Sequence, residues 1–410
     1  MRSNQTILAT CYAVNPYKGS EDAMGWNFVY QIARFRKVIA ITRENNRASI
    51  EKYMAENPDH IYENITFLYF DLPYWMRFWK KGSRGAMLYY YLWQKGIVTF
   101  IRKQKLDFDI AHNVNFHNDW TPSFLWKLNK PMVWGPVGHH PLIPKHYLKD
   151  YSKKYLIKDR LTWLVKLFFW NYSSSLKKTI KNADHIWCMN SGVPEKLGLE
   201  KHQYSVYPSV ASEDFSQKDE IVIKDDFTVM SVGRFVPLKG FDLTIRSFAG
   251  FINQLPAKDK ARCKLILVGK GEQKEFYLNL ITENQMNDHI EIIEWINRKD
   301  LMKMYEKASV FLFPSHEGAG MVVPEALSFG LPVICLENEG PGEFINRHCG
   351  FTVSQQEYTK TVEDLGNALL RSFSEKNLHR EMSLGARKQY LEKFSWEKRG
   401  DHLNTIYNKI

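Results

Sequence analysis

Several features are scarce or missing in this chain of 410 residues, and each absence excludes a class of protein. No run of about 18 uncharged apolar residues occurs, so we expect no segment that spans a bilayer. The five cysteines form no CxxC pair, which excludes a zinc ribbon and favours a reducing compartment. Residues 1–14 lack a separate apolar core and a cleavage site, so a first strand is predicted there instead of a signal peptide. The expectation is a soluble, cytoplasmic protein of about two domains.

Acidic residues are scarce in the first half of the chain. Residues 1–210 carry 30 Lys and Arg against 16 Asp and Glu, a net +14, whereas residues 211–410 carry 26 against 29. Residues 72–106 contain no acid, and both they and residues 145–181 interleave basic with aromatic side chains. Cations attract anionic lipid at about 1 kcal/mol each, and Trp and Tyr favour the headgroup level.

These stretches predict peripheral contact with an anionic membrane, at the inner face of the cell membrane. The alternative is that the aromatic side chains lie in the core and the lysines are merely solvated. Nucleic acid is not expected as a partner, because no recognition motif accompanies the charge.

Apolar runs alternate with helical periodicity along the chain, which predicts parallel α/β units. Strands are expected at Thr6–Thr10, Lys37–Thr42, Ile65–Tyr69, Ile110–Asn113, Pro131–Trp134, His185–Met189, Phe227–Val232, Lys264–Val268, Ile290–Ile293, Val310–Phe313, Val333–Leu336 and Phe351–Val353. The predicted fold class is α/β, with two doubly wound, Rossmann-like domains facing across a cleft. Ligands are then expected at the carboxyl ends of strands, in the crevice between the domains.

The expected division gives residues 1–205 to an N-terminal domain and residues 206–390 to a C-terminal domain. Residues 206–221 contain a proline, serines and several charges, and are predicted to form a hinge. Residues 391–410 are expected to form a terminal helix that can cross back to the N-terminal domain.

The densest motif lies in residues 311–334. A predicted strand is followed by Glu317, by glycines at 318 and 320, and by a helix expected from Met321 to Phe329 that holds Glu325. Two glycines before a helix allow an anion to approach unpaired backbone N–H groups. Taken alone, these residues leave two interpretations open: ligand-binding carboxylates, or a solvated loop glutamate and one that complements the helix dipole.

Upstream, Gly233 and Arg234 directly follow a predicted strand, and Lys239 comes just before the next predicted helix. Arginine binds a pyrophosphate through paired hydrogen bonds, and lysine binds it as a point charge. Together these positions predict a site for a diphosphate.

An ordered set of motifs in the second half resembles the donor-binding half of family 4 glycosyltransferases, which have the GT-B fold. The motifs are GR…KG, LILVGKG, IEWINRKDLMKMYEKASVFLFPS and E-x7-E. The resemblance covers residues 225–350. It implies a retaining, metal-independent hexosyltransferase that needs no cofactor. The donor would be a nucleotide sugar, and the acceptor a glycan or lipid-linked molecule of surface polysaccharide synthesis. A sugar phosphorylase, a nucleotide-sugar epimerase and a non-catalytic nucleotide-sugar-binding subunit are the alternatives.

The resemblance also implies roles for residues of the second half. Arg234 and Lys239 would neutralise the departing diphosphate, Glu317 would orient the donor sugar, and Glu325 would accept hydrogen bonds from the ribose hydroxyls. The other donor-binding residues that it implies are Gly233, Gly269, Ile296, Gly318, Ala319, Gly320, Met321 and Val322.

The first half resembles the same family more loosely. Gly19 and Ser20 match a glycine-rich first loop on the acceptor side, and His139 is expected on that side too. Many members place a histidine after the fourth strand, near the sugar hydroxyls. His117 is the preferred match, with the neighbouring positions His112 and Asn113 left open. A bacterial polysaccharide subgroup of the family commonly has the sequence G-P-x-G-G in this region. Here the residues Gly135 to Gly138 are followed by a histidine pair at 139 and 140.

Two patterns that could hold a metal are predicted to be structural. Asp107 and Asp109 spell the DxD pattern, but they precede a predicted strand at its amino end, the wrong end for a ligand. The histidine pair at 139 and 140 has no carboxylate or thiolate at ligand spacing. No metal site is expected.

Overall fold

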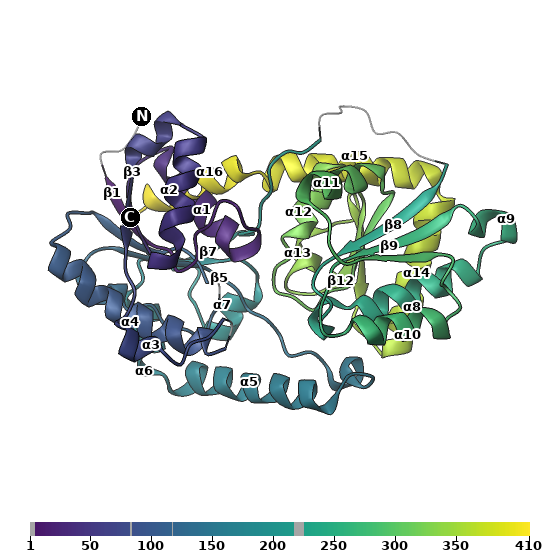
Figure 1. Cartoon of the computed structure of the whole chain (residues 1–410), viewed down its shortest axis with the longest axis horizontal. Helices are drawn as coiled ribbons and strands as arrows, with labels where there is room; N and C mark the ends of the chain where they lie inside the picture. The colour runs from purple at the N-terminus through teal and green to yellow at the C-terminus, as the bar shows by residue number, and fades with distance from the viewer. Residues whose placement is uncertain (1–4, 83, 117, 217–224) are drawn as a thin grey trace. The chain divides into compact units, whose positions relative to one another are not determined.

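The computed structural model describes residues 5–82, 84–116, 118–216 and 225–410. These residues form two compact units (Figure 1). The first unit comprises residues 1–139, 161–209 and 396–410, and the second comprises residues 140–160 and 210–395. Each unit is built around its own parallel sheet, as the alternation of strand and helix signals predicts.

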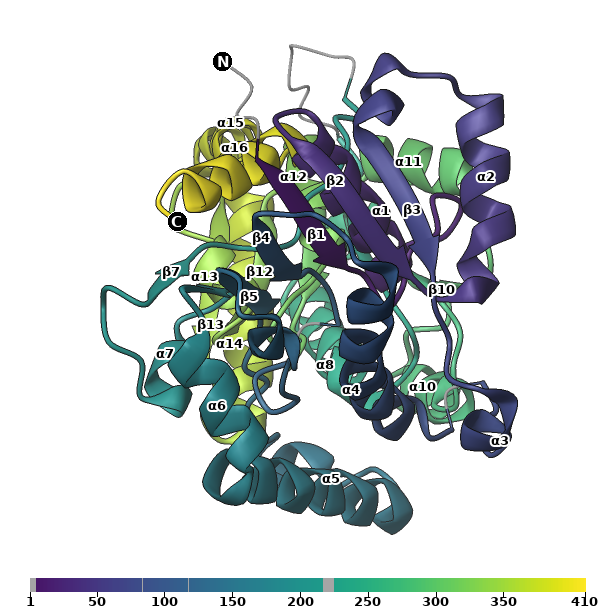
Figure 2. The same ribbon diagram turned by 90° about the vertical axis from the view of Figure 1, so that its left-hand side faces the viewer.

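The first unit contains a seven-stranded sheet in the order β3-β2-β1-β4-β5-β6-β7, with every pair parallel. Figure 2 shows strands β1, β2 and β3 side by side. The strands are β1 (Thr6–Thr10), β2 (Lys37–Thr42), β3 (Ile65–Tyr69), β4 (Ile110–Asn113), β5 (Met132–Val137), β6 (His185–Cys188) and β7 (Tyr204–Val206). The strand order reverses between β1 and β4, which is the switch point of a doubly wound sheet.

Helices cover both faces of this sheet. On one face, Tyr90, Trp93 and Ile97 pack against Trp134 and Ile186 of the sheet. On the other face, Phe28 contacts the rings of Trp187 and Trp396. The helices of this unit are α1 (Ser20–Ala33), α2 (Arg47–Glu56), α3 (Tyr74–Arg77), α4 (Ala86–Gln104), α6 (Ser174–Asn182), α7 (Gly192–Leu197) and α16 (Trp396–Tyr407), and the longer part of α5 (Lys153–Tyr172) also belongs here.

The second unit contains a six-stranded parallel sheet in the order β10-β9-β8-β11-β12-β13, with its switch point between β8 and β11. The strands are β8 (Phe227–Val232), β9 (Cys263–Val268), β10 (Ile290–Ile293), β11 (Val310–Phe313), β12 (Val333–Glu337) and β13 (Gly350–Ser354). The helices are α8 (Phe241–Asn253), α9 (Ala257–Lys260), α10 (Lys274–Glu283), α11 (Arg298–Lys307), α12 (Val322–Ser328), α13 (Pro341–Phe344), α14 (Tyr358–Ser374) and α15 (Lys376–Lys393).

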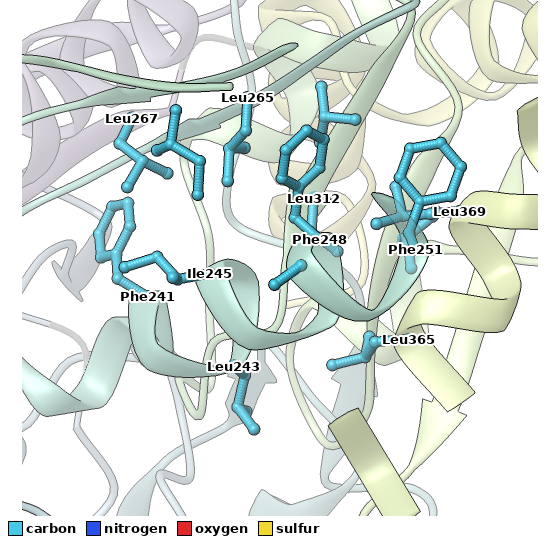
Figure 3. Close-up of a cluster of buried hydrophobic side chains, with 14 of the residues drawn as sticks. Phe241, Leu243, Ile245, Phe248, Phe251, Leu265, Leu267, Leu312, Leu365 and Leu369 are labelled. Carbon is cyan, nitrogen blue, oxygen red and sulfur yellow. The ribbon is translucent and has the colours of Figure 1, made fainter. Parts of the chain in front are cut away.

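Alternate residues of the strands bury opposite faces of this second sheet. Val229 packs with the helices α8, α10 and α14, whereas Met230 packs with α11, α12 and α15. In Figure 3, Phe241, Ile245 and Phe248 of α8 lie toward the sheet residues Leu265, Leu267 and Leu312. Burying a large apolar side chain is worth about 1.5–3 kcal/mol, so this face anchors α8 and the loop before it.

Residues 140–160 correct the expected division, which gave them to the N-terminal domain. Ile143, Tyr147, Leu148 and Tyr151 are buried in the same apolar core as α8. The Tyr151 hydroxyl also donates a hydrogen bond of 2.6 Å to Asp242 on α8. These residues follow a first-unit strand in the sequence, but tertiary burial of their aromatic side chains places them with the second unit.

The turn into α8 depends on glycine at position 240. Gly240 has φ +67°, and a Cβ built there would lie 2.1 Å from the carbonyl oxygen of Pro314. We expect Gly240→Ala to lower the free energy of unfolding by at least about 1–3 kcal/mol, from backbone strain alone. Gly250→Ala is the matched control, because Gly250 lies in the same helix with open space around its Cα, and it should raise stability by about 0.5–1 kcal/mol. Denaturant unfolding of both variants measures the difference, and equal stabilities would contradict this interpretation.

Candidate functional site

The polar groups of the second unit converge at the switch point of its sheet. The carboxyl end of β8 leads into Gly233 and Arg234, and the carboxyl end of the neighbouring strand β11 leads into Glu317. In doubly wound sheets, ligands bind at the carboxyl ends of strands where the strand order reverses. The position of these loops makes them the candidate site of this unit.

An ion pair joins the two loops. The ammonium Nζ of Lys239 donates a hydrogen bond of 2.7 Å to Oε2 of Glu317, although 78 residues separate them in sequence. Only 13% of the Lys239 side chain and 17% of the Glu317 side chain are exposed. A pair so shielded from water is electrostatically stronger than a surface pair, and removal of one partner leaves the other charge uncompensated.

Small residues let the lysine reach the glutamate. A Cβ at Gly233 would lie 3.3 Å from Cδ of Lys239, so the lysine stem passes directly over this glycine. Gly269 has φ +153°, and a Cβ there would overlap the carbonyl oxygen of Gly233 at 1.8 Å. A Cβ at Gly340 would likewise overlap the carbonyl oxygen of Glu317 at 2.1 Å. The glycines therefore shape both loops around the ion pair.

The loop from Gly318 to Met321 brings backbone N–H groups next to Glu317. The amide of Gly318, one of the predicted donor-binding residues, donates a 3.0 Å hydrogen bond to Nδ1 of His140. Within the described part of the chain, the amides of Ala319, Gly320 and Met321 make no hydrogen bond to protein. Val322 begins α12, which ends at Ser328, slightly shorter than the helix expected from Met321 to Phe329.

Arg234 differs from Lys239 in its surroundings. It lies in the same loop after β8, its side chain is exposed, and it forms no ion pair with any residue that the structure describes. Its guanidinium is therefore accessible to an anion.

Glu325 lies on α12 and is almost completely buried. Its Oε1 accepts a hydrogen bond of 3.0 Å from Nη1 of Arg298, the first residue of α11. Burial raises the pKa of Glu325, and the charge of Arg298 opposes that rise. Ile296, two residues before α11, is half-buried and packs against the apolar cluster formed by residues of α11, α12 and α15. Arg298 was not predicted as a site residue, because no sequence pattern links it to Glu325, which lies 27 residues later.

The acceptor-side candidates lie in the first unit and are not alike. Gly19 and Ser20 are exposed at the start of α1. His139 is buried after β5, and its Nδ1 lies 2.7 Å from Oδ2 of the equally buried Asp119, in the loop after β4. Asp119 was not predicted, because its contact with His139 joins two loops that are 20 residues apart and share no sequence pattern.

Two alternatives for the histidine after the fourth strand are core residues. His112 bonds Tyr407 through Nδ1 at 2.5 Å and the carbonyl of Gly135 through Nε2 at 2.6 Å, and burial lowers its pKa to about 3. Asn113 donates a hydrogen bond of 3.3 Å to Thr10 and is also buried. His117, the preferred position, lies outside the described residues.

Metal-ligating side chains are not clustered in the described ranges: no group of three or more His, Cys, Asp or Glu there could hold an ion. Asp109 directly precedes β4, and its Oδ2 accepts a hydrogen bond of 2.7 Å from the backbone amide of Thr6. This contact ties the amino ends of β1 and β4 together, which is a structural use of the DxD pattern.

Comparison with known sequences links the second unit to one family. Residues 212–389 match the family described as glycosyl transferases group 1. A curated relative, an uncharacterised glycosyltransferase of Haemophilus influenzae, is 31% identical over 152 residues, which cover 36% of this chain and 41% of the relative. The chain spans about half the length of the curated relatives it matches.

Comparison with solved structures extends over both units. A sucrose-phosphate synthase of Thermosynechococcus elongatus has a TM-score of 0.68 and 18% identity, with 99% of each chain covered. The Anabaena protein Alr3699/HepE in complex with UDP has a TM-score of 0.62 and 12% identity, with 99% of this chain and 100% of the other covered. At these identities the likeness concerns the fold, two parallel-sheet α/β domains of the GT-B class.

Proposed function

Residues 212–389 form a domain of the glycosyl transferases group 1 family, and from that premise we propose that the chain transfers a sugar from a nucleoside-diphosphate donor. The observation that carries the proposal is the ion pair between Lys239 and Glu317 at the switch point of the second sheet. It places a positive and a negative group side by side at the expected ligand position. A sugar diphosphate needs both, a cation for its phosphates and a carboxylate for its sugar hydroxyls. The UDP bound to the similar Anabaena protein also supports a nucleoside diphosphate.

Lys239 and Arg234 act on the leaving group. As the bond between the sugar C1 and the phosphate oxygen breaks, negative charge grows on the diphosphate. The two cations stabilise that charge more strongly than they bind the ground state, which is what accelerates the reaction. The amides of Ala319, Gly320 and Met321, which make no hydrogen bond to the residues that the structure describes, add donors beside them.

Glu317 orients the donor sugar and stabilises positive charge at C1. The acceptor hydroxyl oxygen forms its bond to C1 on the face that the phosphate leaves, so the configuration is retained. Its proton passes to the departing phosphate oxygen, and no covalent bond between Glu317 and the sugar is required. Glu325 holds the ribose hydroxyls, and backbone groups near Ile296 hold the base.

The acceptor in this proposal is a glycan or a lipid-linked molecule of surface polysaccharide synthesis, bound by the first unit. Gly19 and Ser20 are exposed there and can contact it. His139 is held by Asp119, and we assign it the role of fixing the chain after β5 on the acceptor side.

Removal of either cation should slow turnover, and for Arg234, whose side chain is exposed, it should leave folding little changed. We expect Lys239→Met and Arg234→Met each to lower kcat/KM by a factor that corresponds to a loss of about 2–4 kcal/mol of transition-state stabilisation. Lys258→Met is the matched control, because Lys258 is an exposed lysine of α9 with no ion pair among the described residues. The measurement is initial-rate kinetics on the sugar nucleotide that best raises the melting temperature. Wild-type kinetics in both variants would refute the assignment, and product analysis separates transfer from phosphorolysis and epimerisation.

Metal independence is also part of the proposal. The cations at the switch point are side chains, and Asp109 is engaged in joining β1 to β4. We expect an excess of EDTA to leave the initial rate unchanged within error, with added Mg²⁺ as the control. Loss of activity with EDTA that Mg²⁺ restores would contradict the proposal.

Peripheral membrane contact is supported by aromatic side chains that the core does not bury. Tyr74, Trp75 and Phe78 around α3 are exposed, with 72% of Trp75 accessible, whereas Tyr89, Tyr90 and Trp93 of α4 are core residues. The aromatic side chains of α4 therefore fit the core interpretation of this stretch, and those around α3 support the proposed membrane contact.

Helix α5 shows a second exposed apolar stripe at helical spacing. Its members are Leu161, Leu164, Val165, Phe168 and Tyr172. The helix carries five basic residues and one acidic residue, which favours an anionic lipid surface. None of the helices in the described ranges has the length and hydropathy needed to cross a bilayer, so the proposed contact is with the surface alone.

Removal of the basic residues near α3 should weaken membrane binding. We expect the triple variant Lys80→Gln, Lys81→Gln, Arg84→Gln to sediment less with vesicles containing anionic lipid at physiological salt, since each cation contributes about 1 kcal/mol. The control variant Lys258→Gln, Lys260→Gln, Lys264→Gln changes the net charge equally in the second unit. Equal sedimentation of both variants would contradict a specific surface.

A further inference from the structure

Arg298 holds the carboxylate of Glu325 from one side. The two groups form an ion pair of 3.0 Å between Nη1 and Oε1. The glutamate side chain is only 10% exposed, whereas the arginine side chain is 56% exposed. The pair therefore joins a buried anion on α12 to a cation that faces water on α11.

An aromatic ring, that of Phe215, also contacts the guanidinium of Arg298. The Cζ of Arg298 lies 4.9 Å from the centre of the Phe215 ring, and Phe215 stacks on Phe329 with an interplanar angle of 9°. The segment that holds Phe215 is tied down in turn, because Arg387 of α15 bonds both oxygens of Asp214 at 2.6 and 2.7 Å. An arginine placed on an aromatic face loses little further freedom when it binds a carboxylate.

The charges around Glu325 leave Arg298 as its compensating cation. Burial is the main cause that raises the pKa of this carboxyl, and Glu213 adds to the rise. Arg298 and the Tyr305 hydroxyl, both on α11, oppose it. Arg387, which approaches from α15, already pairs with Asp214 and bonds the carbonyl of Ser328.

We propose that Arg298 is a positioning residue of the nucleoside site, which keeps Glu325 charged and correctly oriented for the two ribose hydroxyls. This inference rests on the proposed function, which assigns those hydroxyls to Glu325. It also defines the ligand further. The site would select a ribonucleotide over its 2′-deoxy counterpart, because the ionised carboxylate of Glu325 would bind both ribose hydroxyls.

The chemistry of a carboxyl group explains why its charge decides recognition. An ionised carboxylate offers acceptor sites on both oxygens, so it can bind two neighbouring hydroxyls at once. The neutral acid turns one oxygen into a donor and loses the stronger, charge-assisted bonds. Because the Arg298 side chain faces water, we expect its larger effect on ligand binding and a smaller one on stability.

The test compares ribonucleotide with deoxyribonucleotide binding. Calorimetry gives the Kd of the whole chain for uridine, adenosine and guanosine diphosphates and for their 2′-deoxy forms, between pH 5.5 and 8.5. The variants are Arg298→Gln, the conservative Arg298→Lys, and the neighbouring exposed residue Lys299→Gln as control.

We expect the wild type to prefer the ribose form of its nucleotide by about tenfold or more, as for hydrogen bonds to a charged group. In Arg298→Gln the pKa of Glu325 rises further, so the carboxyl takes up a proton as the pH falls through that value. The preference for ribose should therefore shrink to a few fold at the acid end and recover toward pH 8.5. Arg298→Lys should restore most of the preference, and Lys299→Gln should match the wild type.

Three results would overturn the inference. An unchanged ribose preference in Arg298→Gln at every pH would show that the arginine is only structural. Tighter ribonucleotide binding in Arg298→Gln would show that the guanidinium blocks the hydroxyl site. Absence of ribose preference in a wild type that binds a diphosphate would remove Glu325 from the site. If the wild type binds none of the three diphosphates, the proposed function itself fails.

Discussion

The ion pair between Lys239 and Glu317 is the interaction on which the second unit's site depends. It connects the loops that leave two adjacent parallel strands, and it does so where the strand order reverses. Because both side chains are largely shielded from water, neither charge is well tolerated without the other. A Cβ at Gly240, Gly269 or Gly340 would collide with backbone, and one at Gly233 would press on the stem of Lys239, so the backbone closes around the pair. The site is thus preorganised by the fold before any ligand arrives.

The charges of this site follow one arrangement. Glu317 has Lys239 as its cation, and Glu325 has Arg298, while Arg234 remains exposed without an ion pair among the described residues. A ligand with two negative phosphates and several hydroxyls complements that arrangement, because the exposed cation binds the phosphate charge and the paired carboxylates accept hydrogen bonds from the hydroxyls. Preorganised charges of this kind need little rearrangement when charge develops on a leaving group.

Much of this could be read from the sequence, for local reasons. Strands such as Phe227–Val232 and Val310–Phe313 have the predicted bounds, because fully buried parallel strands are continuous apolar runs between turn signals. The three-residue strand β7 was missed, because its residues are not buried and give no apolar pattern. Lys239 and Glu317 were singled out by their positions after strands, and the structure brings them together.

Contacts that arise only in three dimensions were not predictable. The Asp119–His139 pair joins two loops and the Arg298–Glu325 pair joins two helices, with no pattern in the intervening sequence. The docking of residues 140–160 on α8 depends on tyrosines, and aromatic side chains alone do not reveal what buries them. The hydrogen bond from the amide of Gly318 to the imidazole of His140 likewise has no signal in the sequence.

A crystal structure of the whole chain with a nucleoside diphosphate bound is the most direct measurement. The account predicts phosphate oxygens within about 3 Å of Nζ of Lys239 and of the Arg234 guanidinium, beyond the ends of β8 and β11. A diphosphate bound elsewhere, with the Lys239–Glu317 pair closed and out of contact, would contradict it.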